Sequence, residues 1–159
     1  MTRLQDIVRA SNADIKIGSW RNGKVPKADF PIAKKAYGLG NSFQWCVISF
    51  SALGLECRVL VVLNAPKEKY EAILGVLAEG QMRILSSYEF HAGEPGWHCH
   101  ASCGDVAKIP KGFMRGPWVR RIPRAHRTHT RQDFGIDGQR KAERFAITCY
   151  KVETKGSLL

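Results

Sequence analysis

The pattern of apolar and polar residues predicts mainly β-strands between residues 43 and 152. Apolar residues there alternate with polar ones or form short apolar runs, and segments with turn-forming residues separate the runs. Residues 59–63 are continuously apolar, which is typical of a central strand covered on both faces. The segments predicted to be strands are 44–50, 58–63, 82–91, 97–103 and 145–152.

One segment, residues 65–79, has the period of an amphipathic helix that lies on a sheet. Asn64 can cap this helix, Pro66 falls in its first turn and Gly80 can end it. A shorter amphipathic helix is expected at residues 2–10. The apolar stripe of the longer helix, at the i, i+3, i+4, i+7 spacing, consists of Tyr70, Ile73, Leu74 and Leu77.

These elements predict an α+β fold in a single domain spanning residues 1–159. From 58 to 103 the order is strand, helix, strand, strand, as in a ferredoxin-like antiparallel sheet with one main packed helix. Residues 43–152 should form the sheet core. We expect a helical and loop region at 1–42 and a frayed tail at 153–159.

The charge of the chain favours a polyanionic partner. There are 25 Lys and Arg residues against 14 Asp and Glu, which gives a net charge of +11 at pH 7. We therefore expect nucleic acid rather than a membrane, and a basic protein without such a partner is the alternative. No apolar run approaches the ~18–20 residues of a membrane span, and the N-terminus lacks the apolar core of a signal peptide. With five cysteines, expected to be reduced, the sequence predicts a cytoplasmic protein.

The positive charge is concentrated in residues 106–131, a segment without acidic residues. Its glycines and prolines predict a long basic loop, better suited to following single-stranded DNA or RNA than to entering a duplex groove. Arginine suits phosphate contacts and stacking on exposed bases. A solvated loop with Trp118 in the core is the alternative. The residues expected to bind nucleic acid are Lys108, Lys111, Arg115, Trp118, Arg120, Arg121, Arg124, Arg127 and Arg131.

A dense group of histidines suggests a metal site. On a strand over 97–103, His98 and His100 point to the same face. If the preceding loop spans 92–97, His91 pairs with His98 and Glu89 lies opposite His100, and all four can bind a divalent ion such as Mn²⁺, Mg²⁺ or Zn²⁺. A register shift of one residue would remove Glu89 and His91 from this face. The alternative is that the histidines only form hydrogen bonds.

Two stretches of this region resemble the HUH family of rolling-circle replication initiators, relaxases and single-strand transposases. The first is residues 61–66 with the predicted helix and strand that follow, and the second is Gly93-Glu-Pro-Gly-Trp-His-Cys-His100. The family signature is two histidines that flank a usually hydrophobic residue on a sheet strand, often preceded by Gly-Trp or Pro. The resemblance covers about residues 58–103.

The resemblance implies specific roles for these residues. His98 and His100 would be metal ligands and catalytic, with Cys99 between them and His91 or Glu89 as the third ligand. The bound ion would polarise a scissile phosphate. The family also uses a nucleophilic tyrosine, normally on a downstream helix and often followed four residues later by lysine.

Tyr150 is the one tyrosine after His100, and so it is the candidate catalytic tyrosine. It departs from the family pattern because it falls in a predicted strand, with Thr154 at the fourth position after it. A relative that binds or hydrolyses nucleic acid without a tyrosyl intermediate fits this sequence better.

Three functions stay open on the sequence. The first is a nucleic-acid-binding protein with metal-dependent phosphodiester cleavage on single-stranded DNA or RNA. The second is a non-enzymatic mobile-element or phage-type protein that binds nucleic acid or a nucleoprotein complex. The third is a metal-free RNase with His126 and His129 as general acid and base.

Overall fold

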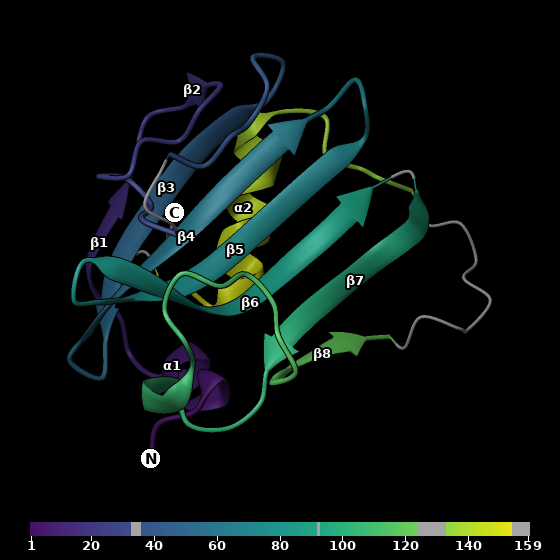
Figure 1. Cartoon of the computed structure of the whole chain (residues 1–159). Helices are drawn as coiled ribbons and strands as arrows, with labels where there is room; N and C mark the ends of the chain where they lie inside the picture. Colours follow the sequence, from purple (N-terminus) through teal and green to yellow (C-terminus); the bar gives the residue numbers. More distant parts are fainter. Residues whose placement is uncertain (33–35, 92, 124–132, 154–159) are drawn as a thin grey trace.

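The computed structural model describes the chain except residues 33–35, 92, 124–132 and 154–159. An eight-stranded antiparallel sheet dominates it, with two α-helices and one short 3-10 helix (Figure 1). The elements are α1 (Leu4–Arg9), β1 (Ala13–Ile17), β2 (Arg21–Asn22), β3 (Gln44–Ala52), β4 (Leu55–Asn64), β5 (Lys69–Ala78), β6 (Gln81–His91), β7 (Glu94–Ser102), the 3-10 helix η1 (Val106–Lys108), β8 (Val119–Ile122) and α2 (Gln139–Tyr150).

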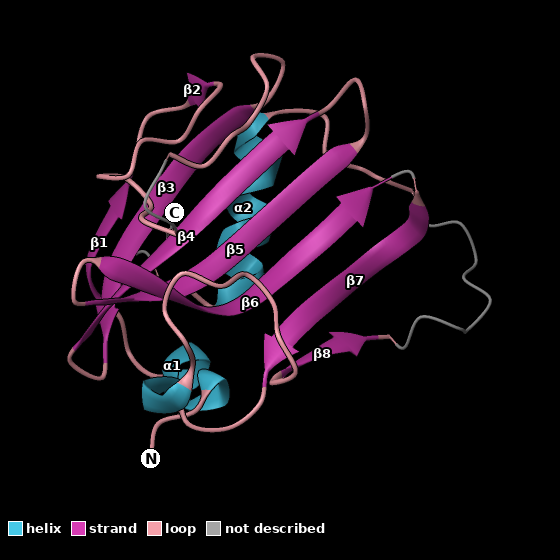
Figure 2. Cartoon of the chain, in the orientation of Figure 1, coloured by secondary structure: helices cyan, strands magenta, loops and turns pink. Residues whose placement is uncertain are grey.

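From β3 to β8 each strand pairs with the next one along the chain, so the sheet is a meander (Figure 2). The strand order is β1-β3-β4-β5-β6-β7-β8, and β2 also pairs with β3. The predicted α+β class is confirmed, but the ferredoxin-like arrangement is not present, because four consecutive strands, β4 to β7, occupy the segment predicted as strand, helix, strand, strand. The region 1–42 also contributes β1 and β2, beyond the helix and loop expected there.

The two faces of the sheet are covered differently. Helix α2 lies across one face, which we call the helix face, and the larger apolar cluster fills the space between them (Figure 1). On the opposite face, Val25, Phe30 and Ile32 cover a smaller apolar cluster that includes Trp45 and Leu60. This opposite face also carries Ser87 and Glu89 of β6 and His98 and His100 of β7, because side chains alternate along a strand.

The helix predicted at 65–79 is wrong, since this segment forms a turn and strand β5. The Asn64 side chain accepts a hydrogen bond from the Lys67 backbone N–H at 3.2 Å, which is a turn interaction made by the same residue that can cap a helix. Strand β5 is buried on both faces, and its apolar run therefore matches a helical stripe as well as a strand. Gly75 lies at a bulge, where an added Cβ would come within 2.7 Å of Met82 Cε.

The strand predicted at 145–152 is also wrong, because residues 139–150 form α2. The residues buried against the sheet are Ala142, Ala146 and Tyr150, which recur every four residues as one stripe of a helix. The strand prediction was based on the alternation of Phe145, Ile147 and Cys149, which are only partly buried. Two small alanines carried the helical signal, and they contribute little to an apolar pattern.

The predicted basic loop at 106–131 contains regular structure. It begins with η1, and β8 (Val119–Ile122) pairs with β7 at the edge of the sheet. Residues 124–131 of this segment lie outside the described part. Because side chains alternate along a strand, Arg120 and Arg121 of β8 point to opposite faces of the sheet.

Two tyrosine hydroxyls join α2 to β5. Tyr70 Oη donates to the Ala142 carbonyl oxygen at 2.8 Å, and Tyr150 Oη donates to the Ala72 carbonyl oxygen at 2.7 Å. Both tyrosines are buried. The bonds fix the position of the helix on the sheet because they run in opposite directions between the two elements.

We expect Tyr150→Phe to lower the free energy of unfolding by about 1–2 kcal/mol, because it removes a buried donor and keeps the ring contacts. Urea unfolding measures the change. The control is Thr148→Ala, an exposed side chain that bonds within α2, and it should cost less than about 0.5 kcal/mol. Equal losses in the two variants would contradict this role of Tyr150.

Candidate metal centre

The hairpin of β6 and β7 brings the predicted ligands onto one face. The observed register pairs Glu89 with His98 and Ser87 with His100, while His91 pairs with Glu94. The predicted pairs, His91 with His98 and Glu89 with His100, are therefore wrong. Strand β7 begins at Glu94, so the turn is shorter than expected. The register differs by two residues, and an even shift keeps each side chain on its predicted face.

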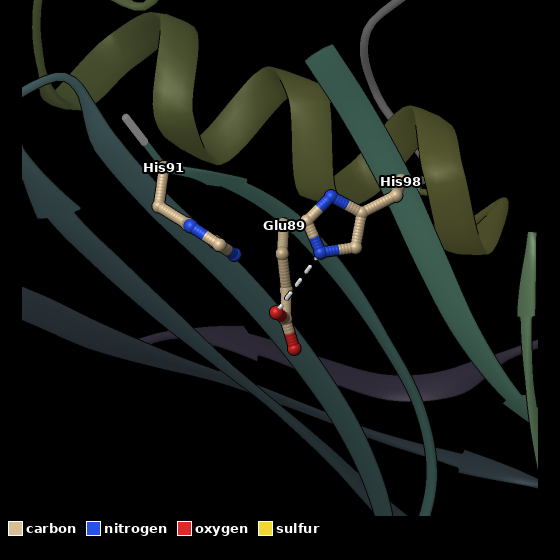
Figure 3. A group of neighbouring side chains, drawn as sticks. All are labelled: Glu89, His91 and His98. Carbon is tan, nitrogen blue, oxygen red and sulfur yellow. Dashed lines mark ion pairs between the residues drawn. The ribbon is translucent and has the colours of Figure 1, made fainter. Parts of the chain in front are cut away.

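Glu89, His91 and His98 form a compact group, the candidate metal centre (Figure 3). One ligand atom from each residue lies within 4.8 Å of those of the other two. The His91 and His98 ring centroids are 5.1 Å apart. Glu89 and His98 are each 3% exposed. Two imidazoles and a carboxylate are an established donor set for divalent metals, so this group could hold a metal ion.

The two carboxylate oxygens of Glu89 have different partners. Oε1 accepts a hydrogen bond from Ser87 Oγ at 2.6 Å and one from the guanidinium of Arg115. Oε2 faces the imidazoles, with His98 Nε2 at 3.3 Å and His100 Nε2 at 3.8 Å. Ser87 and Arg115 thus hold the carboxylate in position, and its second oxygen is directed toward the histidines.

The surroundings of His98 favour a cation next to this oxygen. His98 Nδ1 lies 3.4 Å from the Gly96 carbonyl oxygen, which can only accept a hydrogen bond. His98 Nε2 hydrogen-bonds Oε2 of Glu89, and a metal ion held by these residues would replace that proton. A backbone carbonyl that orients the second nitrogen is a common feature of metal-bound histidines.

The charges of the group are strongly perturbed. Burial raises the pKa of Glu89, but hydrogen bonds from His98, Ser87 and Arg115 outweigh it and lower this pKa to about 2. Glu89 is therefore a carboxylate at neutral pH. Burial, followed by the charge of Arg115, lowers the pKa of His100, which favours its neutral form. A neutral imidazole can bind a metal or accept a proton.

Two residues near the group were not predicted from the sequence. Glu71 pairs across the strands with Glu89, and burial and the Glu89 charge raise the pKa of Glu71 to about 7. Burial and the charges of both glutamates raise the pKa of Tyr37 to about 12. Placing Glu71 beside Glu89 requires the β5–β6 register, which the predicted helix at 65–79 excluded, and Tyr37 is placed by its bridge to Val25.

Only some of the predicted nucleic-acid-binding residues lie near the candidate metal centre. Arg115 contacts Glu89 directly, and Arg121 on β8 pairs with His100 on β7. Lys111 pairs with Glu79 at the opposite end of the β5–β6 hairpin. Lys108 and Arg120 are exposed, and Trp118 is partly buried against the core. The other predicted residues lie outside the described part of the chain: Arg124, Arg127 and Arg131, together with His126 and His129.

Tyr150 lies away from the candidate metal centre. It is on a helix, as the family pattern requires, but α2 buries it on the helix face of the sheet, whereas His98 and Glu89 lie on the opposite face. Burial raises the pKa of its hydroxyl well above the ordinary value. Such a phenol is a poor nucleophile, and its observed contact is structural.

Comparison of the chain with models of known protein families, with curated proteins and with solved structures gave no match. The HUH resemblance therefore stays a prediction. Within the described residues, neither α-helix is long and apolar enough to cross a membrane.

The raised pKa of Glu71 predicts a pH dependence of stability in the metal-free protein. The pKa rises from 4.5 to about 7 on folding, so the folded state binds this proton more tightly and stability falls as pH increases from about 4.5 to 7. Glu71→Gln removes this loss. We expect the variant to be more stable than the unsubstituted chain at pH 8, by up to about 3 kcal/mol.

Urea unfolding at several pH values in EDTA measures this difference, which should shrink toward pH 4.5. Glu56→Gln, at an exposed glutamate, is the control and should not change the slope. A constant difference between Glu71→Gln and the unsubstituted chain over this range would exclude the assigned pKa.

Proposed function

We propose that this chain is a metal-dependent phosphodiesterase that acts on single-stranded nucleic acid. The observation that carries the proposal is the carboxylate of Glu89, which contacts imidazoles through one oxygen and Arg115 through the other. The Glu89 side chain thus belongs to the candidate metal centre and also contacts Arg115, a cation that can bind phosphate. The net charge of +11 supports a polyanionic substrate.

The donor set narrows the choice of metal. Glu89, His91 and His98 would hold the ion, with His100 next to them. Two nitrogen donors favour Mn²⁺ or Zn²⁺ over Mg²⁺, which prefers oxygen ligands. Such an ion would polarise a phosphate oxygen and lower the pKa of a bound water.

The other residues have separate roles in this proposal. The Arg115 side chain is 50% exposed, so its guanidinium can contact a phosphate while it lies beside Glu89. His100, whose Nε2 lies 3.8 Å from Glu89 Oε2, would accept a proton from the attacking water in the neutral form that burial favours. Arg121, its cross-strand neighbour, extends the positive charge along the edge of the sheet.

A second candidate function is nucleic-acid binding without cleavage. The specific observation in its favour is that Ser87 and Arg115 already compensate the Glu89 charge, so the group needs no metal for its charge balance. This function would need the basic residues but no metal.

We expect the double substitution His98→Ala with His100→Ala to reduce cleavage of labelled single-stranded DNA or RNA at least 100-fold in Mn²⁺. Binding measured by gel shift should stay within about threefold, since phosphate contacts dominate affinity. EDTA should abolish cleavage by the unsubstituted chain. His126→Ala with His129→Ala is the matched control and should keep chelator-sensitive activity.

Cleavage that survives both EDTA and the first double substitution would eliminate the metal mechanism. If the His126 and His129 substitutions then abolished it, the metal-free RNase would be the correct function. Binding without cleavage in any metal would favour the second candidate.

The salt dependence of binding tests the role of the exposed basic residues. We expect Arg120→Ala and Lys108→Ala each to reduce the slope of log K against log salt by about 0.7, the value for one lost phosphate contact on a single strand. Lys141→Ala is the control, because Lys141 lies on α2 and pairs with Asp137. An unchanged slope in the first two variants would remove them from the binding surface.

A further inference from the structure

A cavity of about 510 Å³ adjoins the candidate metal centre. Its volume falls in the range of about 300–1,000 Å³ that is typical of small-molecule sites. It lies where the β6–β7 hairpin approaches the ends of β4 and β5. The lining includes Leu39, Phe43, Val62, Lys69, Glu71 and His91.

Two lining residues bring the cavity next to the candidate metal centre. His91 belongs to both the lining and the group. Glu71, also in the lining, is the cross-strand neighbour of Glu89, and such neighbours lie about 5 Å apart on one face. A ligand in the cavity is therefore within reach of an ion held by the group.

The lining combines three kinds of chemistry. Leu39 and Val62 are apolar, and Phe43 presents an aromatic ring with Lys69 Nζ 5.9 Å from its centroid. An aromatic ring with a nearby cation can stack on a nucleobase and contact its phosphate. Glu71 is also in the lining, and in its ionised form it offers two acceptor oxygens.

We propose that this cavity binds one unpaired guanine nucleotide, with the base stacked on Phe43 and its Watson–Crick edge hydrogen-bonded to Glu71. Among the common bases guanine has two adjacent N–H donors on that edge, which match the two oxygens of a carboxylate. Lys69 contacts the phosphate. The inference rests on the proposed function, because the nucleotide in the cavity places its neighbouring phosphate at the candidate metal centre.

Binding of 5′-GMP, AMP, CMP and UMP to the full chain, measured by calorimetry in EDTA at pH 8, where Glu71 is a carboxylate, tests the cavity without using catalysis. We expect GMP to bind at least tenfold more tightly than the other three, because only guanine can donate two adjacent hydrogen bonds to one carboxylate. Glu71→Gln should remove the preference for GMP, and Leu39→Trp, which fills the cavity, should remove binding of all four.

Each control makes the same type of substitution at an exposed position away from the cavity. Glu56→Gln changes an exposed strand glutamate, and Ile17→Trp adds the same bulk at an exposed position on β1, so both should bind GMP normally. Thermal melting verifies that each variant is folded.

The outcomes separate this inference from the proposed function. If GMP binds as described but cleavage survives EDTA, the cavity assignment holds and the metal mechanism fails. If cleavage requires metal but no nucleotide binds at millimolar concentration, or folded Glu71→Gln and Leu39→Trp bind GMP normally, the inference is overturned. Equal affinity for all four nucleotides would overturn the assignment of guanine.

Discussion

The burial of the Glu89 carboxylate is the constraint on which the site depends. An unpaired buried charge costs several kcal/mol, so the surrounding structure must supply hydrogen bonds and opposite charge. Ser87 supplies a donor from the same strand, β7 brings the histidines, and the segment before β8 brings Arg115. The arrangement of three chain segments around one side chain follows from this requirement.

The ligand group was predictable because it rests on local periodicity. His98 and His100 are two residues apart, so any strand places them on one face, and an error of two residues in pairing left Glu89 and His91 with them. Arg115 was predicted only as a phosphate ligand. Its contact with Glu89 depends on how a long connection folds back, and no local pattern encodes that path.

The errors in the fold arose where two structures share one pattern. Asn64 and Pro66 suit both a helix start and a hairpin turn, and a strand that is buried on both faces has no alternation to distinguish it from a helix. In α2 the residues that face the sheet include Ala142 and Ala146, whose small side chains barely mark an apolar stripe. Tertiary packing decided both segments.

The shared carboxylate would link metal binding and anion binding thermodynamically. Arg115 and a metal ion held by the imidazoles would draw on the negative charge of the same Glu89 side chain. An anion that attracted Arg115 would leave more of that charge for the metal, and a bound metal would in turn release Arg115 toward the anion. Because such coupling is reciprocal, metal and phosphate should bind cooperatively, each increasing the affinity for the other.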